Sequence, residues 1–172
     1  MRTRDLAVSV LLAALYAGGV IALPGLSFQV AQVRVSDALL PLSMVFGMPA
    51  VVGLTVGTFV ANIFSPFGAV DLLGGTLTNL VATYLAWKMA RNFNFRGRWL
   101  FAAAFQVLLI TFVVGTYIQA FVNIPETPLL GFRVPGIVFS WLGVLTGSII
   151  SIMVIGYPVA KAAAKYLSRE PF

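Results

Sequence analysis

The residues best suited to binding chemistry in this chain form one short polar stretch, Gln32-Val-Arg34-Val-Ser36-Asp37. Its carboxylate can accept hydrogen bonds from the N–H groups of a ligand, and such charge-assisted bonds contribute roughly 1.5–3 kcal/mol each. In this interpretation Arg34 orients Asp37 toward a pocket. A structural interpretation competes with it, because Ser36 or Asp37 can cap a helix that begins here. Arg34 would then pair with Asp37 or with a lipid headgroup.

A second polar group follows farther along the chain. Asp71 opens a predicted helix whose polar residues, among them Thr76, Asn79 and Thr83, recur at a spacing of three and four and so share one face. In lipid such a stripe must face protein or water, although capping is again an alternative for Asp71. The candidate ligand-binding residues are therefore Gln32, Arg34, Ser36, Asp37, Asn62, Asp71, Asn79 and Gln119.

The residue types that the chain lacks exclude several chemistries. It contains no Cys and no His, which removes thiol nucleophiles, imidazole bases and the usual zinc ligands. No phosphate loop of the GxxxxGK type occurs, so the chain does not hydrolyse ATP by that route. We expect no enzyme activity, no catalytic residue, no bound metal and no cofactor.

The elements that position these residues are apolar helices. The 172-residue chain is 60% hydrophobic and 9% charged, with a mean hydropathy of +0.99, which is too little charge for a soluble domain. We expect an all-α integral membrane protein with a single domain over residues 1–172. Runs of apolar residues predict helices at about 6–23, 37–48, 50–64, 69–88, 99–121 and 135–160.

The positions of the basic residues predict the orientation. Nine of the eleven gather in three clusters: Arg2 and Arg4; Lys88, Arg91, Arg96 and Arg98; Lys161, Lys165 and Arg169. Cytoplasmic loops of membrane proteins carry such residues, and this explains the net charge of +6 better than nucleic-acid binding does. The prediction is a multi-pass plasma-membrane protein of six transmembrane helices with both termini cytoplasmic; a re-entrant pair at 38–63 is the alternative. Loops 24–37, 64–68 and 122–135 would face outside.

Small residues recur at four-residue spacing in the first predicted helix, and this spacing lets helices approach closely. Ala13, Ala17 and Gly18 are the candidate docking residues. The surface that they meet can be another helix of this chain or a partner protein.

The chain resembles the QueT family, the substrate-binding (S) components of energy-coupling factor (ECF) transporters for queuosine precursors, over nearly its whole length. Four stretches carry the resemblance: Ala13-Ala14-Leu-Tyr-Ala17; Gln32-Val-Arg34-Val-Ser36-Asp37-Ala-Leu; Gly57 through Asp71; and Ile155-Gly-Tyr-Pro158. One departure concerns the last helix, where the family commonly has a Gly-Glu pair and this chain has Gly147-Ser148.

The resemblance implies a six-helix protein that binds a 7-deazaguanine from outside and delivers it inward with a membrane scaffold subunit and two cytoplasmic ATPases. Asp37 or Asp71 would accept the paired N–H donors of the guanine-like edge, and Arg34 would hold a carboxylate in place. The amides of Gln32, Asn62, Asn79 and Gln119 would supply neutral hydrogen bonds, and aromatic residues would stack on the ring. The face of Ala13 and Ala17 would dock on the scaffold.

Three other functions stay open at this point. The chain could be an S component for another vitamin-like substrate, an autonomous small channel or facilitator, or a purely structural membrane subunit. Flux in liposomes without an ATPase would favour the facilitator. The absence of any co-purifying ligand would favour the structural subunit.

Overall fold

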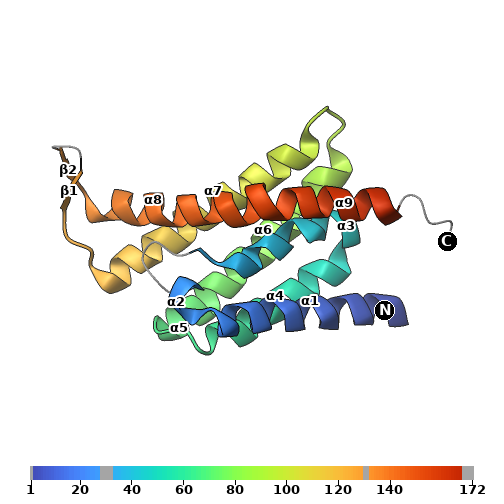
Figure 1. Ribbon diagram of the computed structural model, residues 1–172, viewed down its shortest axis with the longest axis horizontal. Coiled ribbons are helices and arrows are strands. Elements are labelled where there is room, and N and C mark those ends of the chain that lie inside the picture. Colours follow the sequence, from blue (N-terminus) through green and yellow to red (C-terminus); the bar gives the residue numbers. More distant parts are fainter. Residues whose placement is uncertain (1, 28–32, 130–131, 168–172) are drawn as a thin grey trace.

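The structure is a computed structural model that describes residues 2–27, 33–129 and 132–167 (Figure 1). Almost every element in these ranges is helical. In chain order they are α1 (Thr3–Ala22), α2 (Pro24–Ser27), η1 (Val35–Leu42), α3 (Ser43–Phe46), α4 (Met48–Asn62), α5 (Gly68–Val70), η2 (Asp71–Gly75), α6 (Thr76–Asn92), α7 (Arg98–Val122), β1 (Thr127–Leu129), β2 (Phe132–Val134), α8 (Gly136–Ser148), η3 (Ile149–Gly156) and α9 (Tyr157–Leu167).

Several of these elements join end to end into longer helices. Four of the described segments are long and apolar enough to cross a membrane: Thr3–Ala22, Gly68–Asn92, Arg98–Val122 and Gly136–Leu167. Two shorter apolar segments, Val35–Phe46 and Met48–Asn62, meet at Gly47. Its φ of +67° breaks the helix there, and this conformation favours glycine. The all-helical class predicted from the sequence and its membrane character are therefore confirmed.

The short segment Met48–Asn62 packs closely on α1 through glycines. A Cβ at Gly53 would lie 2.4 Å from the backbone oxygen of Ser9, and one at Gly57 would lie 2.8 Å from that of Ala13. Only glycine permits this approach. On the same face of α1, Ala13 is half-buried and Ala17 is buried. These two candidate docking residues therefore pack inside the protein.

Gly18 differs from these two alanines. It is exposed, and a Cβ added to it would meet no atom within 4 Å. The neighbouring Ala14, Leu11 and Leu15 are exposed as well. The face of α1 that is open to a partner is therefore turned away from Ala17 and centred between Leu11 and Gly18.

The two ends of the bundle carry different residues. Figure 1 shows the start of α1, the turn between α6 and α7 and the end of α9 at one end, whereas α2, α5 and the two strands lie at the other. The described members of all three basic clusters thus gather at one end. Arg169 lies outside the described residues.

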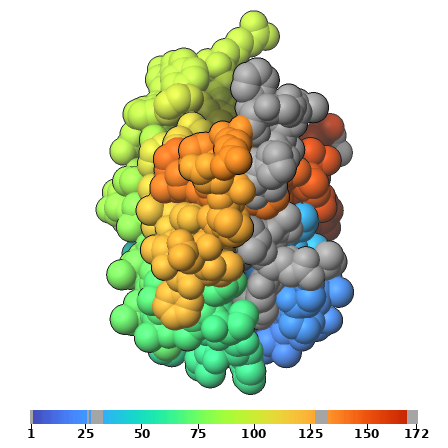
Figure 2. Space-filling view, turned by 90° about the vertical axis from the view of Figure 1, so that its left-hand side faces the viewer, coloured from blue at the N-terminus to red at the C-terminus, as the bar shows by residue number. Residues whose placement is uncertain are grey.

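The opposite end carries a small hairpin that the sequence did not predict. Strands β1 and β2 pair antiparallel, with Thr127 opposite Val134 and Leu129 opposite Phe132. Loop 122–135 was expected without regular structure, because the spacing of its three prolines gives no strand pattern. The end of α7, which precedes this hairpin, lies beside the α4–α5 turn (Figure 2). Phe67 and Phe121 make an edge-to-face contact there, with ring centroids 6.4 Å apart.

Candidate functional site

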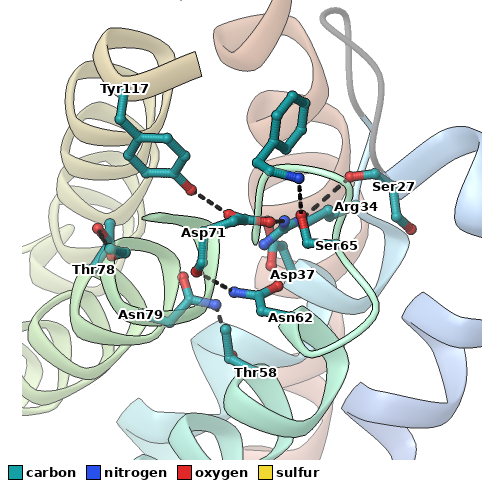
Figure 3. A network of polar contacts seen from close by, with 12 residues as sticks. Ser27, Arg34, Asp37, Thr58, Asn62, Ser65, Asp71, Thr78, Asn79 and Tyr117 are labelled. Atoms are coloured by element: carbon teal, nitrogen blue, oxygen red, sulfur yellow. Dashed lines mark hydrogen bonds and ion pairs between the residues drawn. The ribbon is translucent and has the colours of Figure 1, made fainter. Parts of the chain in front are cut away.

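A buried ion pair lies at the centre of the polar site (Figure 3). Arg34 Nη2 donates to Asp71 Oδ2 at 2.7 Å, and the two side chains are 7% and 1% exposed. The hydroxyl of Tyr117 donates to Asp71 Oδ1, and Arg34 Nε donates to the Ser27 carbonyl at 3.3 Å. Both oxygens of the Asp71 carboxylate are therefore occupied by groups of the protein itself.

The second carboxylate, Asp37, has a different environment. Its Oδ1 accepts a hydrogen bond of 2.6 Å from the hydroxyl of Tyr16 on α1. The Asn79 amide donates to that hydroxyl and to Thr58 Oγ1, both at 2.9 Å. In the described part of the chain, no cation forms an ion pair with Asp37. A relay of neutral groups from three helices therefore holds this carboxylate in position.

A small cavity opens between these groups. Its polar lining comes from Arg34, Asp37, Asn79 and Ser148, and its apolar lining from Ile110, Val114 and Val144, with Gly75 completing the wall. The space between the lining atoms amounts to about 330 Å³, but it is so narrow that only about one water molecule fits without moving a side chain. The cavity has one charged and one apolar side, as sites for small organic molecules do.

Local backbone structure explains how the cavity is assembled. Residues Asp71–Gly75 form a π-helical turn, an irregularity that is frequent at functional sites. A Cβ on Gly75 would lie 2.6 Å from Asn62 Nδ2 and 2.9 Å from Asp71 Oδ1, so the missing side chain leaves room for both polar groups. Asn62 Nδ2 in turn donates to the Asp71 carbonyl at 2.8 Å and satisfies a backbone oxygen in the π-helical turn.

The structure distributes the predicted site residues over three roles. Arg34, Asp37 and Asn79 line the cavity, whereas Asn62 and Asp71 support it from behind. Ser36 and Gln119 take no part in the described cavity lining. Gln32, the remaining predicted residue, lies outside the described residues.

Ser36 and Gln119 contact other parts of the protein. The Ser36 hydroxyl is buried without a hydrogen-bond partner among the described residues and lies against Gly19 of α1. Gln119 Nε2 donates to the Ile124 carbonyl at 3.1 Å, so it stabilises the segment that follows the end of α7.

Two interpretations made from the sequence are wrong. Arg34 pairs with Asp71, 37 residues away, and not with the nearby Asp37. Neither carboxylate caps a helix: no side-chain cap bond is found at the start of η1 or η2, and the carboxylates accept from Tyr16, Arg34 and Tyr117.

Sequence reasoning missed several residues of the site. The one sequence signal for Tyr16 is its hydroxyl within an apolar helix, since such a group usually finds a hydrogen-bond partner when it is buried. Tyr117 carries no sequence signal that separates it from other aromatic residues of an apolar helix, yet its hydroxyl donates a hydrogen bond to Asp71. Nothing in the sequence pattern marked the apolar lining residues Ile110, Val114 and Val144, since they are typical of any apolar helix.

The groups at the cavity are suited to hydrogen bonding with a ligand. The described residues contain no cluster of three or more Asp, Glu, His or Cys side chains that could hold a metal. The charged groups are a guanidinium already paired with a carboxylate and a second carboxylate that accepts a hydrogen bond from the Tyr16 hydroxyl. Hydrogen bonding of a polar ligand to Asp37 and Asn79, with apolar contact on the opposite wall, is what this geometry supports.

A polar cavity inside a bundle of membrane-crossing helices is typical of membrane transport proteins. The comparison with protein families agrees: the model of the QueT transporter family matches residues 6–165. The chain therefore belongs to the QueT transporter family, and no match was found among curated proteins or solved structures. This membership favours a transporter over an enzyme.

Proposed function

We propose that the chain is the substrate-binding S component of an ECF importer. In this proposal it lies in the plasma membrane with six crossings and both termini cytoplasmic. It takes up a 7-deazaguanine queuosine precursor from outside and delivers it inward together with a scaffold subunit and two ATPases. The gathering of the described basic residues at one end supports the orientation, since cytoplasmic ends carry Lys and Arg.

The observation that carries the proposal is the difference between the two carboxylates. Asp71 is fully engaged by Arg34 and Tyr117, whereas Asp37 lines the cavity and forms no ion pair in the described part of the chain. Asp37 is thus the carboxylate that can accept the adjacent N–H donors of a guanine-like edge. Asn79 beside it adds an amide, and the apolar wall of α7 and α8 contacts the ring faces.

The narrowness of the cavity adds a requirement. A bicyclic base does not fit into space for one water, so binding has to move lining groups apart. Ligand binding should therefore change the packing of α7 and α8 against η1, the element that carries Asp37. The ligand-bound protein should also unfold at a higher temperature than the free protein.

The experiment is a binding assay on the full chain in detergent. Mass spectrometry of co-purifying small molecules comes first, followed by thermal shifts with a panel of 7-deazaguanines and vitamins. We expect a deazaguanine to stabilise the wild-type protein and Asp5→Asn, and to lose this effect with Asp37→Asn. Asp5 serves as the control because its carboxylate lies at the start of α1, whereas Tyr16, the partner of Asp37, lies farther along that helix. The Asp5 carboxylate accepts a hydrogen bond from the Arg2 backbone N–H.

Three results would contradict the proposal in different ways. Stabilisation by a vitamin alone would make the protein an S component for another substrate. Substrate flux in liposomes without any ATPase would make it an autonomous facilitator. No bound ligand and no thermal shift with any compound would favour a structural subunit.

A further inference from the structure

A second binding site, independent of the proposed substrate cavity, lies at the opposite end of the bundle. An open groove of about 470 Å³ lies there between the turn after α6, the start of α7 and the side of α9. The residues that carry the argument are Phe95, Arg96, Arg98, Trp99, Tyr157 and Lys161. We propose that this basic groove binds the phosphate headgroup of an anionic phospholipid.

The charge of the groove is not neutralised by the rest of the described chain. Among the residues that the structure describes, no carboxylate lines it. Asp37 and Asp71 lie at the substrate cavity, Glu126 adjoins the hairpin at the far end, and Asp5 accepts a hydrogen bond from the Arg2 backbone at the start of α1. Three cations around one concave space therefore attract a phosphodiester, and each such residue near a membrane surface strengthens binding of anionic lipid about fivefold.

The aromatic part of the groove argues for a lipid and against a small soluble phosphate. Phe95 belongs to a cluster with Phe93 and Phe101, with ring centroids 5.9–6.1 Å apart, and all three rings are 38–49% exposed. Trp99 and Tyr157 are half-buried beside them. Aromatic residues near the ends of membrane-crossing helices typically lie where the acyl chains meet the headgroups. The groove thus offers cations to a phosphate and rings to the glycerol and upper acyl chain.

Two elements far apart in the sequence form the groove, so an occupant would link them. Lys161 of α9 lies with its Nζ 5.6 Å from the centre of the Tyr157 ring, and Arg98 Nη1 donates to the Phe93 carbonyl at 2.8 Å. Lys161 is therefore held on α9 and Arg98 on the α6–α7 turn. A phosphate between them would connect the end of the chain to this turn.

The test is native mass spectrometry and lipid-dependent thermal unfolding of the full chain with phosphatidylglycerol and phosphatidylcholine. We expect wild type to retain and be stabilised by phosphatidylglycerol only. The double variant Arg96→Gln/Lys161→Gln should weaken the binding of phosphatidylglycerol roughly 30-fold, at about fivefold per cation removed. The control Lys88→Gln/Arg91→Gln removes the same charge from the same end outside the groove lining and should retain the lipid. Arg98 is kept because its bond to Phe93 stabilises the turn.

Four outcomes would overturn the proposal. Equal loss of phosphatidylglycerol in the groove and control variants would show that only the overall charge matters. Equal binding of phosphatidylcholine, whose choline cation offsets the phosphate charge, would show that the net negative charge of the headgroup plays no part. Equal binding of glycerophosphoglycerol, which lacks acyl chains, would make the ligand a soluble phosphate. Unchanged lipid binding with lost assembly on co-expressed scaffold and ATPase subunits would assign the groove to a protein partner.

Discussion

The buried ion pair makes Asp71→Asn the most informative substitution. The change keeps the size of the side chain but removes its charge, so the Arg34 guanidinium, which is buried at 7% exposure, loses the carboxylate of its ion pair. Breaking a buried pair in this way typically costs about 3–5 kcal/mol. In a protein of this size 1 kcal/mol lowers the melting temperature by about 2–4 °C, and the expected decrease is therefore about 6–20 °C.

The assay is thermal unfolding in detergent, followed by tryptophan fluorescence, with Asp5→Asn as the control. The double variant Arg34→Met/Asp71→Leu extends it, because replacing both partners by apolar residues is often neutral or stabilising. We expect the double variant to recover most of the stability that Asp71→Asn loses, yet to bind no ligand if Arg34 is needed in the cavity. A melting temperature within 2 °C of wild type for Asp71→Asn would refute the assignment of Asp71 as the partner that holds Arg34.

The remaining predictions concern the cavity and the helix interface. Asp37→Asn should weaken ligand binding about 10–150-fold, equivalent to one charge-assisted bond of roughly 1.5–3 kcal/mol, with little change in melting temperature. A large decrease in melting temperature together with the loss of affinity would assign Asp37 a structural role. Gly75→Ala places a Cβ 2.6 Å from an amide nitrogen and should lower both stability and affinity, which calorimetry measures. Gly57→Ala should destabilise by about 1–3 kcal/mol through overpacking against α1, whereas Gly18→Ala, with no atom within 4 Å, should leave the melting temperature unchanged.

The candidate site could be predicted in part from the sequence. Arg34, Asp37 and Asn79 stood out because charged and amide groups are costly in lipid unless they face protein or water, and this holds whatever the fold is. Ser36 met the same criterion, yet it lies against Gly19. Local composition identifies which groups must be buried, and it contains no information on which partner each group finds.

The sequence by itself determined the class of the protein, the approximate helices and the sorting of the basic residues, since hydropathy and charge act over about 20 neighbouring residues. The tertiary structure alone decided the contacts across long separations. These contacts join Arg34 to Asp71 over 37 residues, Tyr16 to Asp37 over 21 and Asn79 to Tyr16 over 63. It also decided that Ala13 and Ala17 face α4, since the close approach depends on Gly53 and Gly57 of another helix. Pairing across helices depends on packing in three dimensions, and a pattern along one helix cannot specify it.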